Sequence, residues 1–206
     1  MSFLVTNCFD WIGFHIINYL VENGYQVDGF DNTATNKKEN LAMMVGRNDL
    51  FSLLQDKKEC RERYTAIIIN GSNGHALDLK ADKMVKLCRD EARKEGDAQL
   101  TTVMLPLLFG EWMPMNEKGM YAQNRFVPFD SDVFLNDAIY IEDFVLCLMQ
   151  IIQSNHLPSF IELRSVKDNR KLDKNSKRFI FLRDIRPIEK NVKKVQDHYN
   201  RFKTIY

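Results

Sequence analysis

The stretch from Thr6 to Gly13 stands between a short apolar run and a helical pattern, a place where a chain can bind phosphate. A helix N-terminus offers free backbone N–H groups and the positive end of the helix dipole, and both attract anions. A corner that holds a dinucleotide uses three glycines, for the tight turn, for the approach of the pyrophosphate and for helix–strand packing. Here only Gly13 is kept, and Asn7 and Asp10 fill the other two positions.

These two replacements act against phosphate binding more than against the turn. Asn and Asp tolerate left-handed backbone better than most residues, so the corner can still form. Their side chains add bulk, however, and Asp10 adds a negative charge beside the expected diphosphate. Two unit charges ~4 Å apart repel by ~1 kcal/mol in water and by ~4 kcal/mol at an effective dielectric constant of about 20. Binding would then be roughly ten- to a thousandfold weaker.

Hydrophobic periodicity predicts strands and helices that alternate along most of the chain. The expected strands cover residues 3–6, 25–30, 50–54, 66–69, 101–109, 138–141, 160–164 and 179–182. The expected helices cover residues 11–21, 39–45, 77–95, 142–153 and 188–202, and residues 111–135 are expected to form a loop. Gly24 is expected to end the first helix. This alternation predicts an α/β fold with a mainly parallel sheet and helices on both faces.

The composition excludes several classes of protein. A formal net charge of +1 over 206 residues gives no general attraction to nucleic acid or to anionic lipid. The four cysteines form no C-x-x-C pair and match no zinc spacing, so we expect reduced thiols in the cytoplasm and no metal. Cys8 is expected to be a small buried side chain. There is no basic leader, and no apolar run approaches the ~20 residues needed to span a bilayer.

A series of motifs resembles the extended short-chain dehydrogenase/reductases, the NAD-dependent epimerase/dehydratase family. The segment TNCFDWIG at residues 6–13 is similar to the family's T-G-x-x-G-F-I-G start, and Asp31-Asn32 stands where the family keeps an Asp that holds the adenosine ribose. Four further segments match in order, at residues 35–41 (T-G-x-x-x-N-L), 79–96 (the helix ending in A-R-x-x-G), 103–110 (the strand leading to Y-G-P) and 138–144 (R-D-F-x-Y-V-x-D-V).

The resemblance implies a Rossmann-like single domain, with a core at residues 1–110 and a smaller, substrate-domain-like α+β part at residues 111–206. It implies NAD or NADP as cofactor and nucleotide sugars as substrates. The implied cofactor site is vestigial and consists of Thr6, Asn7, Asp10, Trp11, Ile12, Gly13, Asp31 and Asn32. We expect the cofactor to bind weakly or not at all.

The family's catalytic Tyr-x-x-x-Lys pair is absent from the sequence. Lys80 and Lys83 open the segment that matches its helix, but no tyrosine occurs between Tyr64 and Tyr121. Ser72 is a weak candidate for the family's catalytic Ser/Thr. The polar substrate contacts are replaced as well, by Met104, Leu107, Phe109 and Asn136.

The chain is also shorter than the family's roughly 300 residues, as if one strand–helix unit were missing around residues 70–77. The strand at 66–69 could be the family's fourth or its fifth. Since this region supplies the family's dimer helices, self-association of another kind or a protein partner is expected to cover the truncated sheet.

Three hypotheses about function follow. The first is a non-catalytic relative that acts as a binding, scaffolding or regulatory protein. The second is an active nucleotide-sugar epimerase, dehydratase or reductase with a rebuilt site, in which Asp31, Lys80 or Lys83 and Ser72 would act, with a tyrosine such as Tyr121 or Tyr140. The third is a sensor that binds a nucleotide without turnover.

Overall fold

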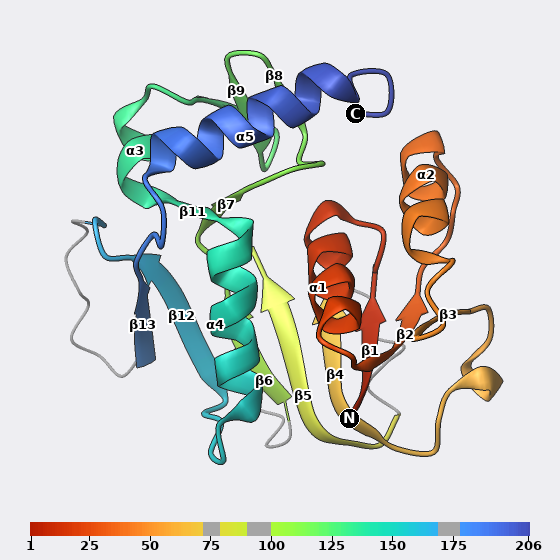
Figure 1. Cartoon of the computed structure of the whole chain (residues 1–206). Helices are drawn as coiled ribbons and strands as arrows, with labels where there is room; N and C mark the ends of the chain where they lie inside the picture. The colour runs from red at the N-terminus through yellow and green to blue at the C-terminus, as the bar shows by residue number, and fades with distance from the viewer. Residues whose placement is uncertain (72–78, 90–99, 169–177) are drawn as a thin grey trace.

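A sheet of eight parallel strands forms the centre of the computed structural model, which describes residues 1–71, 79–89, 100–168 and 178–206 (Figure 1). The strands lie in the order β13-β12-β6-β5-β4-β1-β2-β3. Their bounds are β1 (Ser2–Thr6), β2 (Gln26–Phe30), β3 (Phe51–Leu54), β4 (Tyr64–Asn70), β5 (Ala81–Cys88), β6 (Leu100–Met104), β12 (Phe160–Ser165) and β13 (Arg178–Leu182). The prediction of an α/β fold with a mainly parallel sheet is confirmed.

Each helix comes after a strand along the chain. Their bounds are α1 (Trp11–Glu22), α2 (Asn36–Val45), α3 (Asp132–Asp137), α4 (Ile141–Gln153) and α5 (Ile188–Arg201), with a short 3-10 helix η1 (Lys57–Glu59). The predicted helices at 11–21, 39–45, 142–153 and 188–202 are therefore confirmed with small shifts at their ends. Within the described parts of the chain, no helix is long and apolar enough to cross a membrane.

Helix α1 has strong start and stop signals. Asp10 is its N-cap, with extended backbone and a side chain that accepts a hydrogen bond from the N–H of Ile12. At the other end Gly24 has a φ of 78° and donates to the carbonyl of Val21, while Tyr25 donates to that of Leu20. These two bonds form a Schellman motif, which needs the left-handed backbone that glycine adopts without strain. The predicted role of Gly24 is confirmed.

The predicted helix over residues 77–95 is wrong where the chain is described, because residues 81–88 form strand β5. The spacing of Met84, Leu87 and Cys88 would place these side chains on one face of a helix. The same spacing also fits a strand in a parallel sheet that is covered on both faces. Strand β5 lies between β4 and β6 and is hydrogen-bonded to both. A central position of this kind favours the strand, because both edges of the backbone are paired. Residues 77–78 and 90–95 lie outside the described residues.

The strand order settles which strand residues 66–69 belong to. Strand β4 pairs with β1, so it is the fourth strand of the Rossmann order 3-2-1-4-5-6. That order is complete from β3 to β6. The shortening that the sequence predicts therefore does not fall on a strand of this order. The expected self-association or partner contact at this part of the sheet stays a prediction.

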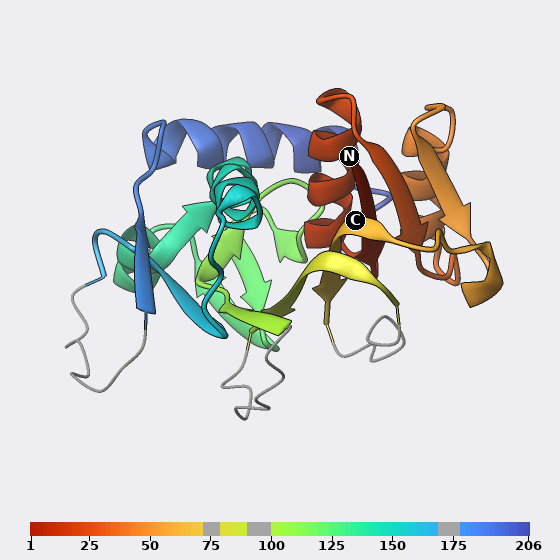
Figure 2. The same ribbon diagram turned by 90° about the horizontal axis from the view of Figure 1, so that it is seen from below.

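Two clusters of buried side chains lie on opposite faces of the sheet. The larger contains Val5, Ile68 and Val85 together with the buried apolar side chains of α1, α2, α3, α4 and α5. The smaller contains Leu4, Ile67, Ile69, Met84 and Leu100, which alternate with members of the first along the strands. Figure 2 shows α1, α4 and α5 together on one side of the sheet. Residues 72–78 and 90–99 are not described, so helices on the other face stay a prediction.

Residues 101–140 contain more secondary structure than the single strand at 101–109 and the loop at 111–135 that the sequence predicts. The strand predicted at 101–109 is divided at Leu105-Pro106 into β6 and β7 (Leu107–Phe109), and β7 pairs with β11 (Ala138–Tyr140). A small antiparallel sheet of β8 (Met115–Asn116), β9 (Gly119–Ala122) and β10 (Arg125–Pro128) follows, and α3 comes after it. Helix α5 runs across the upper part of the molecule, and the β8–β9 hairpin projects beyond it (Figure 1).

Candidate ligand cleft and a buried polar network

A cleft of about 500 Å³ opens at the carboxyl ends of β1, β4 and β5. This is the edge of a parallel sheet at which α/β proteins bind their ligands, next to the switch in strand order between β1 and β4. Its lining residues come from the β1–α1 corner, the ends of β4 and β5, and two neighbouring loops: Asn7, Asp10, Lys38, Asn70, Gly71, Lys86, Leu87, Cys88, Arg89 and Leu105.

Asn7 makes the tight turn in place of a glycine. Its φ of 46° is left-handed, and its side-chain amide donates to the carbonyl of Asn70 at 2.7 Å. The amide of Asn70 donates back to the carbonyl of Asn7 at 3.3 Å, and its backbone N–H donates to the buried hydroxyl of Thr6. The amide of Asn7 therefore ties the end of β1 to the end of β4, which offsets the cost of its backbone conformation.

Gly13 is kept for packing. A Cβ at this position would lie 2.3 Å from the carbonyl oxygen of Asn7 and 2.9 Å from the Cα of Cys8. Both are backbone atoms, so they could not move aside without shifting the corner. Cys8 itself is fully buried, and burial raises the pKa of its thiol, so the expectation of a buried side chain is confirmed.

Asp10 places a carboxylate at the N-terminus of α1. Its Oδ2 accepts from the backbone N–H of Ile12 at 3.4 Å, from the side-chain amide of Asn70 at 3.3 Å and from the guanidinium of Arg89 at 3.2 Å. An N–H at a helix start, an amide and a guanidinium are the donors that commonly bind a phosphate oxygen. In this protein one oxygen of Asp10 accepts from all three.

Asp31 is also engaged within the chain. Its Oδ2 accepts from the N–H of Phe9 at 2.9 Å, and its Oδ1 accepts from the N–H of Asn32 at 2.7 Å. Lys38 forms an ion pair with it at 2.6 Å, and the carboxylate is only 1% exposed. The residue expected at the adenosine ribose thus holds the β1–α1 corner and the start of α2.

The rest of the predicted cofactor set is positioned as part of the same corner. Trp11 and Ile12 are buried at the start of α1, and Asn32 is exposed, with its Oδ1 accepting from the N–H of Ala34. Of the predicted set, only Asn7 and Asp10 line the cleft.

The predicted catalytic lysines do not reach the cleft. Lys83 lies near the start of β5, and its Nζ donates to the carbonyl of Ser154 at 2.7 Å and to that of Ile152, at the end of α4. It thereby compensates the negative end of that helix. Lys80 is exposed before β5 begins, also toward the amino ends of the strands. Neither lysine borders the cleft, because β5 is a strand and its carboxyl end, not its start, lies there. The expected catalytic roles of Lys80 and Lys83 stay predictions. Ser72 lies outside the described residues.

Comparison with known proteins gives the fold. No protein-family model matches the sequence, and no curated protein matches it significantly. Among solved structures, dTDP-glucose 4,6-dehydratase from Bacillus anthracis, in complex with NAD, superposes with a TM-score of 0.65 at 11% identity, over 100% of this chain and 98% of the other. UDP-glucose 4-epimerase from Thermotoga maritima gives 0.60 at 13%, over 98% and 99%, and alfalfa vestitone reductase gives 0.58 at 10%, over 100% and 99%.

The chain has the fold of the NAD-dependent epimerases and dehydratases. Identities of 10–13% establish this likeness for the fold alone. It agrees with the resemblance of the sequence motifs to that family, and with a cleft at the edge of the sheet where β1 and β4 meet.

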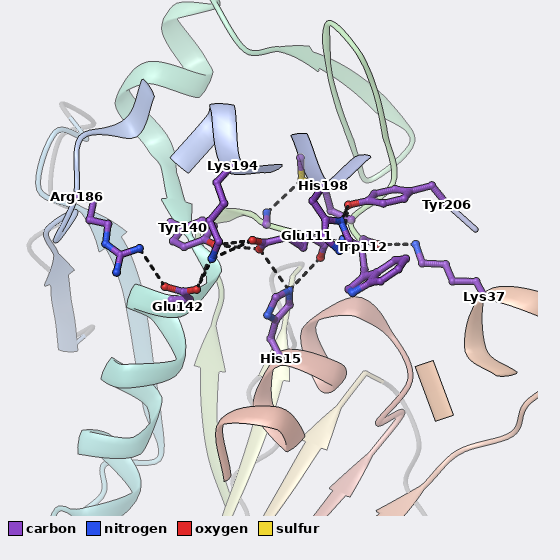
Figure 3. Close-up of polar contacts among 12 residues, drawn as sticks. His15, Lys37, Glu111, Trp112, Tyr140, Glu142, Arg186, Lys194, His198 and Tyr206 are labelled. Atoms are coloured by element: carbon purple, nitrogen blue, oxygen red, sulfur yellow. Dashed lines mark hydrogen bonds and ion pairs between the residues drawn. The ribbon is translucent and has the colours of Figure 1, made fainter. Parts of the chain in front are cut away.

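A second group of polar side chains lies under α5 and was not predicted from the sequence (Figure 3). The hydroxyl of Tyr140 lies 2.9 Å from both carboxylate oxygens of Glu111 and accepts from Lys194 at 2.8 Å. Lys194 also pairs with Glu111 at 3.1 Å and with Glu142 at 2.7 Å. His15 joins the group from α1, with its Nε2 3.0 Å from the carbonyl of Glu111. These contacts connect α1, β11, α4 and α5.

The network is not arranged like the epimerase/dehydratase pair in which a lysine lowers the pKa of a tyrosine. Burial and the neighbouring carboxylates of Glu111 and Glu142 raise the pKa of Tyr140 instead. Burial also lowers the pKa of His15, although Glu111 and Glu142 act in the opposite direction. A tyrosine that stays protonated and a histidine that stays neutral are suited to hydrogen bonding. The arrangement holds α5 to the body of the protein.

The other tyrosine considered from the sequence, Tyr121, lies nearer the cleft. It is 45% exposed on β9 and lines a narrow groove that adjoins the cleft at Arg89 and Leu105. Its hydroxyl accepts from the side-chain amide of Asn116 at 3.3 Å. Among the described residues no lysine contacts this hydroxyl, so no Tyr–Lys pair is formed at the cleft.

Proposed function

We propose that this protein is a non-catalytic binding protein built on the epimerase/dehydratase fold. The observation that carries the proposal is the position of Asp10, whose carboxylate takes the hydrogen bonds of Ile12, Asn70 and Arg89. A pyrophosphate at the same helix start would compete for these donors and be repelled by the carboxylate. The chain therefore carries its own anion where a coenzyme would place a phosphate.

The surroundings of Asp31 support the same proposal. In the Rossmann fold an acidic residue after the second strand accepts a hydrogen bond from the adenosine ribose of NAD. Asp31 is 1% exposed and already accepts from Phe9, Asn32 and Lys38. Because this carboxylate is buried, a ribose hydroxyl could reach it only if a neighbouring group moved aside.

The positions of the described candidate catalytic residues support it as well. Proton transfer from a sugar hydroxyl needs a base within hydrogen-bond reach of the substrate. Lys80 and Lys83 lie away from the cleft, Tyr140 is bound to Glu111 and Lys194, and the described part of the cleft contains no tyrosine–lysine pair.

Calorimetric titration with NAD, NADP and UDP-glucose tests the proposal. We expect no binding of the dinucleotides at micromolar affinity to the unaltered protein. The double variant Asn7→Gly, Asp10→Gly restores two glycines, and we expect it to bind NAD at least tenfold more tightly if it folds. The single variant Asp10→Asn, which removes the charge and keeps the helix cap, serves when the double variant is unstable. Micromolar affinity of the unaltered protein for NAD, or turnover of a nucleotide sugar, would contradict the proposal.

A further inference from the structure

Basic side chains outnumber acidic ones among the described residues that line the cleft. These residues include the basic Lys38, Lys86 and Arg89 and the acidic Asp10. Lys38 is paired with Asp31 at 2.6 Å, and Arg89 is paired with Asp10 at 3.2 Å. Within the described residues no acidic side chain pairs with Lys86. Among the described lining residues, Lys86 is therefore the basic side chain that has no acidic partner.

Strand β5 fixes the position of Lys86. Its backbone pairs with Ile69 of β4 and with Thr102 of β6, so the residue lies in the middle of the parallel sheet. Its side chain is half-buried. A lysine in this setting is partly removed from water, and an anion beside it regains part of the lost solvation.

An apolar groove continues from the charged cleft. It has a volume of about 210 Å³ and shares Arg89 and Leu105 with the cleft, and its other walls include Trp11, Leu108 and Met120. The tip of the β9–β10 hairpin closes one side, where the side-chain amide of Gln123 donates to the carbonyl of Arg89 at 2.9 Å. Arg89 is thus held at the junction of a basic cleft and an apolar groove.

We propose that the cleft binds a small organic carboxylate, with the carboxylate beside Lys86 and an aromatic or aliphatic body in the groove between Trp11 and Met120. This inference rests on the proposed function, because a dinucleotide would need the position that Asp10 fills. A single negative charge matches Lys86, which pairs with no acidic side chain among the described residues. The apolar walls match a body that is stabilised when it leaves water. A diphosphate would bring two or more negative charges, whereas the described lining residues offer one basic side chain that has no acidic partner.

The probe is 2-naphthoate, and its binding is measured by calorimetric titration. Acetate is the control that has the carboxylate without the aromatic rings, and 2-naphthamide is the control that has the rings without the charge. We expect 2-naphthoate to bind with a submillimolar Kd, and acetate and 2-naphthamide to bind at least tenfold more weakly. Lys86→Gln should weaken the binding of 2-naphthoate at least tenfold. Lys190→Gln, at an exposed lysine of α5, should leave it unchanged.

Three results would overturn the inference: no binding of 2-naphthoate at millimolar concentration, equal binding of 2-naphthoate and 2-naphthamide, or unchanged affinity in Lys86→Gln. The comparison of the two naphthyl probes needs no variant, so it decides the matter even when Lys86→Gln does not fold. If NAD binds tightly in the parallel titration, the proposed function fails. If neither NAD nor 2-naphthoate binds, only the present inference fails.

Discussion

The carboxylate oxygen Oδ2 of Asp10 lies 3.2 Å from the guanidinium of Arg89, across the cleft entrance between the β1–α1 corner and the end of β5. The two residues are 79 positions apart in the chain. The same oxygen accepts from the N–H of Ile12 and from the amide of Asn70. Asp10 thus caps a helix and, by our proposal, fills the position that a phosphate would take. Its replacement is therefore expected to change both stability and binding.

Replacing Asp10 by Ala removes the cap of α1. An N-cap side chain contributes typically about 1 kcal/mol, so we expect the free energy of unfolding to fall by roughly 1 kcal/mol. Asp10→Asn keeps an oxygen that can accept from Ile12 and should lose less than half of that. Urea denaturation followed by circular dichroism measures both. Equal losses in the two variants would show that the cap does not carry the effect.

Gly13→Ala is expected to destabilise the protein by about 1–3 kcal/mol, the usual cost of overpacking a tight site. The new Cβ would lie 2.3 Å from the carbonyl oxygen of Asn7, and the corner would have to open. Gly24→Ala is the control, because a Cβ there has no atom within 4 Å and only its φ of 78° is unfavourable. Urea midpoints of the two variants provide the comparison. A smaller loss for Gly13→Ala than for Gly24→Ala would contradict the packing role.

Lys194→Met tests the network that holds α5. The substitution leaves the buried carboxylate of Glu111 without its lysine, while the side-chain stem is preserved. Lys194 is 46% exposed, so water screens part of the interaction, and we expect a loss of about 1 kcal/mol. Lys190→Met, on the exposed side of the same helix, should change the unfolding free energy by less than half of that. Thermal unfolding at pH 7 measures the stability of both variants. If Lys194→Met were as stable as Lys190→Met, the contact between Lys194 and Glu111 would have no role in stability.

The neutral state of His15 predicts a dependence of stability on pH. Burial lowers its pKa in the folded protein, and burial lowers that of His198 in the same direction. The unfolded chain, in which a histidine has a pKa of about 6.5, then binds more protons, and stability falls as the pH decreases from 7.5 to 5.5. His15→Gln should reduce this slope, whereas His156→Gln, at an exposed residue, should not. Urea denaturation across this pH range gives the slope, and an unchanged slope in His15→Gln would contradict the assignment.

The β1–α1–β2 unit could be predicted from the sequence because its signals are local. Its cap at Asp10, its stop at Gly24 and the periodicity between them all lie within one short segment. Strand β5 could not, because the spacing of Met84, Leu87 and Cys88 suits a helix as well as a strand, and only pairing with β4 and β6 decides the matter.

Some features of the candidate site could likewise be predicted from the sequence, and others could not. The replacement of glycines by Asn7 and Asp10 is visible in the sequence, but the partner Arg89 is not, because it arrives from a distant strand. The contact between Tyr140 and Lys194 joins residues 54 positions apart and carries no local motif. Polar networks of this kind become visible only when the fold has brought their members together.

A crystal structure of the protein grown with millimolar NAD shows whether Asp10 excludes the coenzyme from the start of α1. We predict that Asp10 keeps its bonds to Ile12, Asn70 and Arg89, and that no coenzyme is seen at the start of α1. Density for a pyrophosphate lying across Asn7 and Asp10, with the Asp10 carboxylate turned away, would show that Asp10 does not exclude the coenzyme.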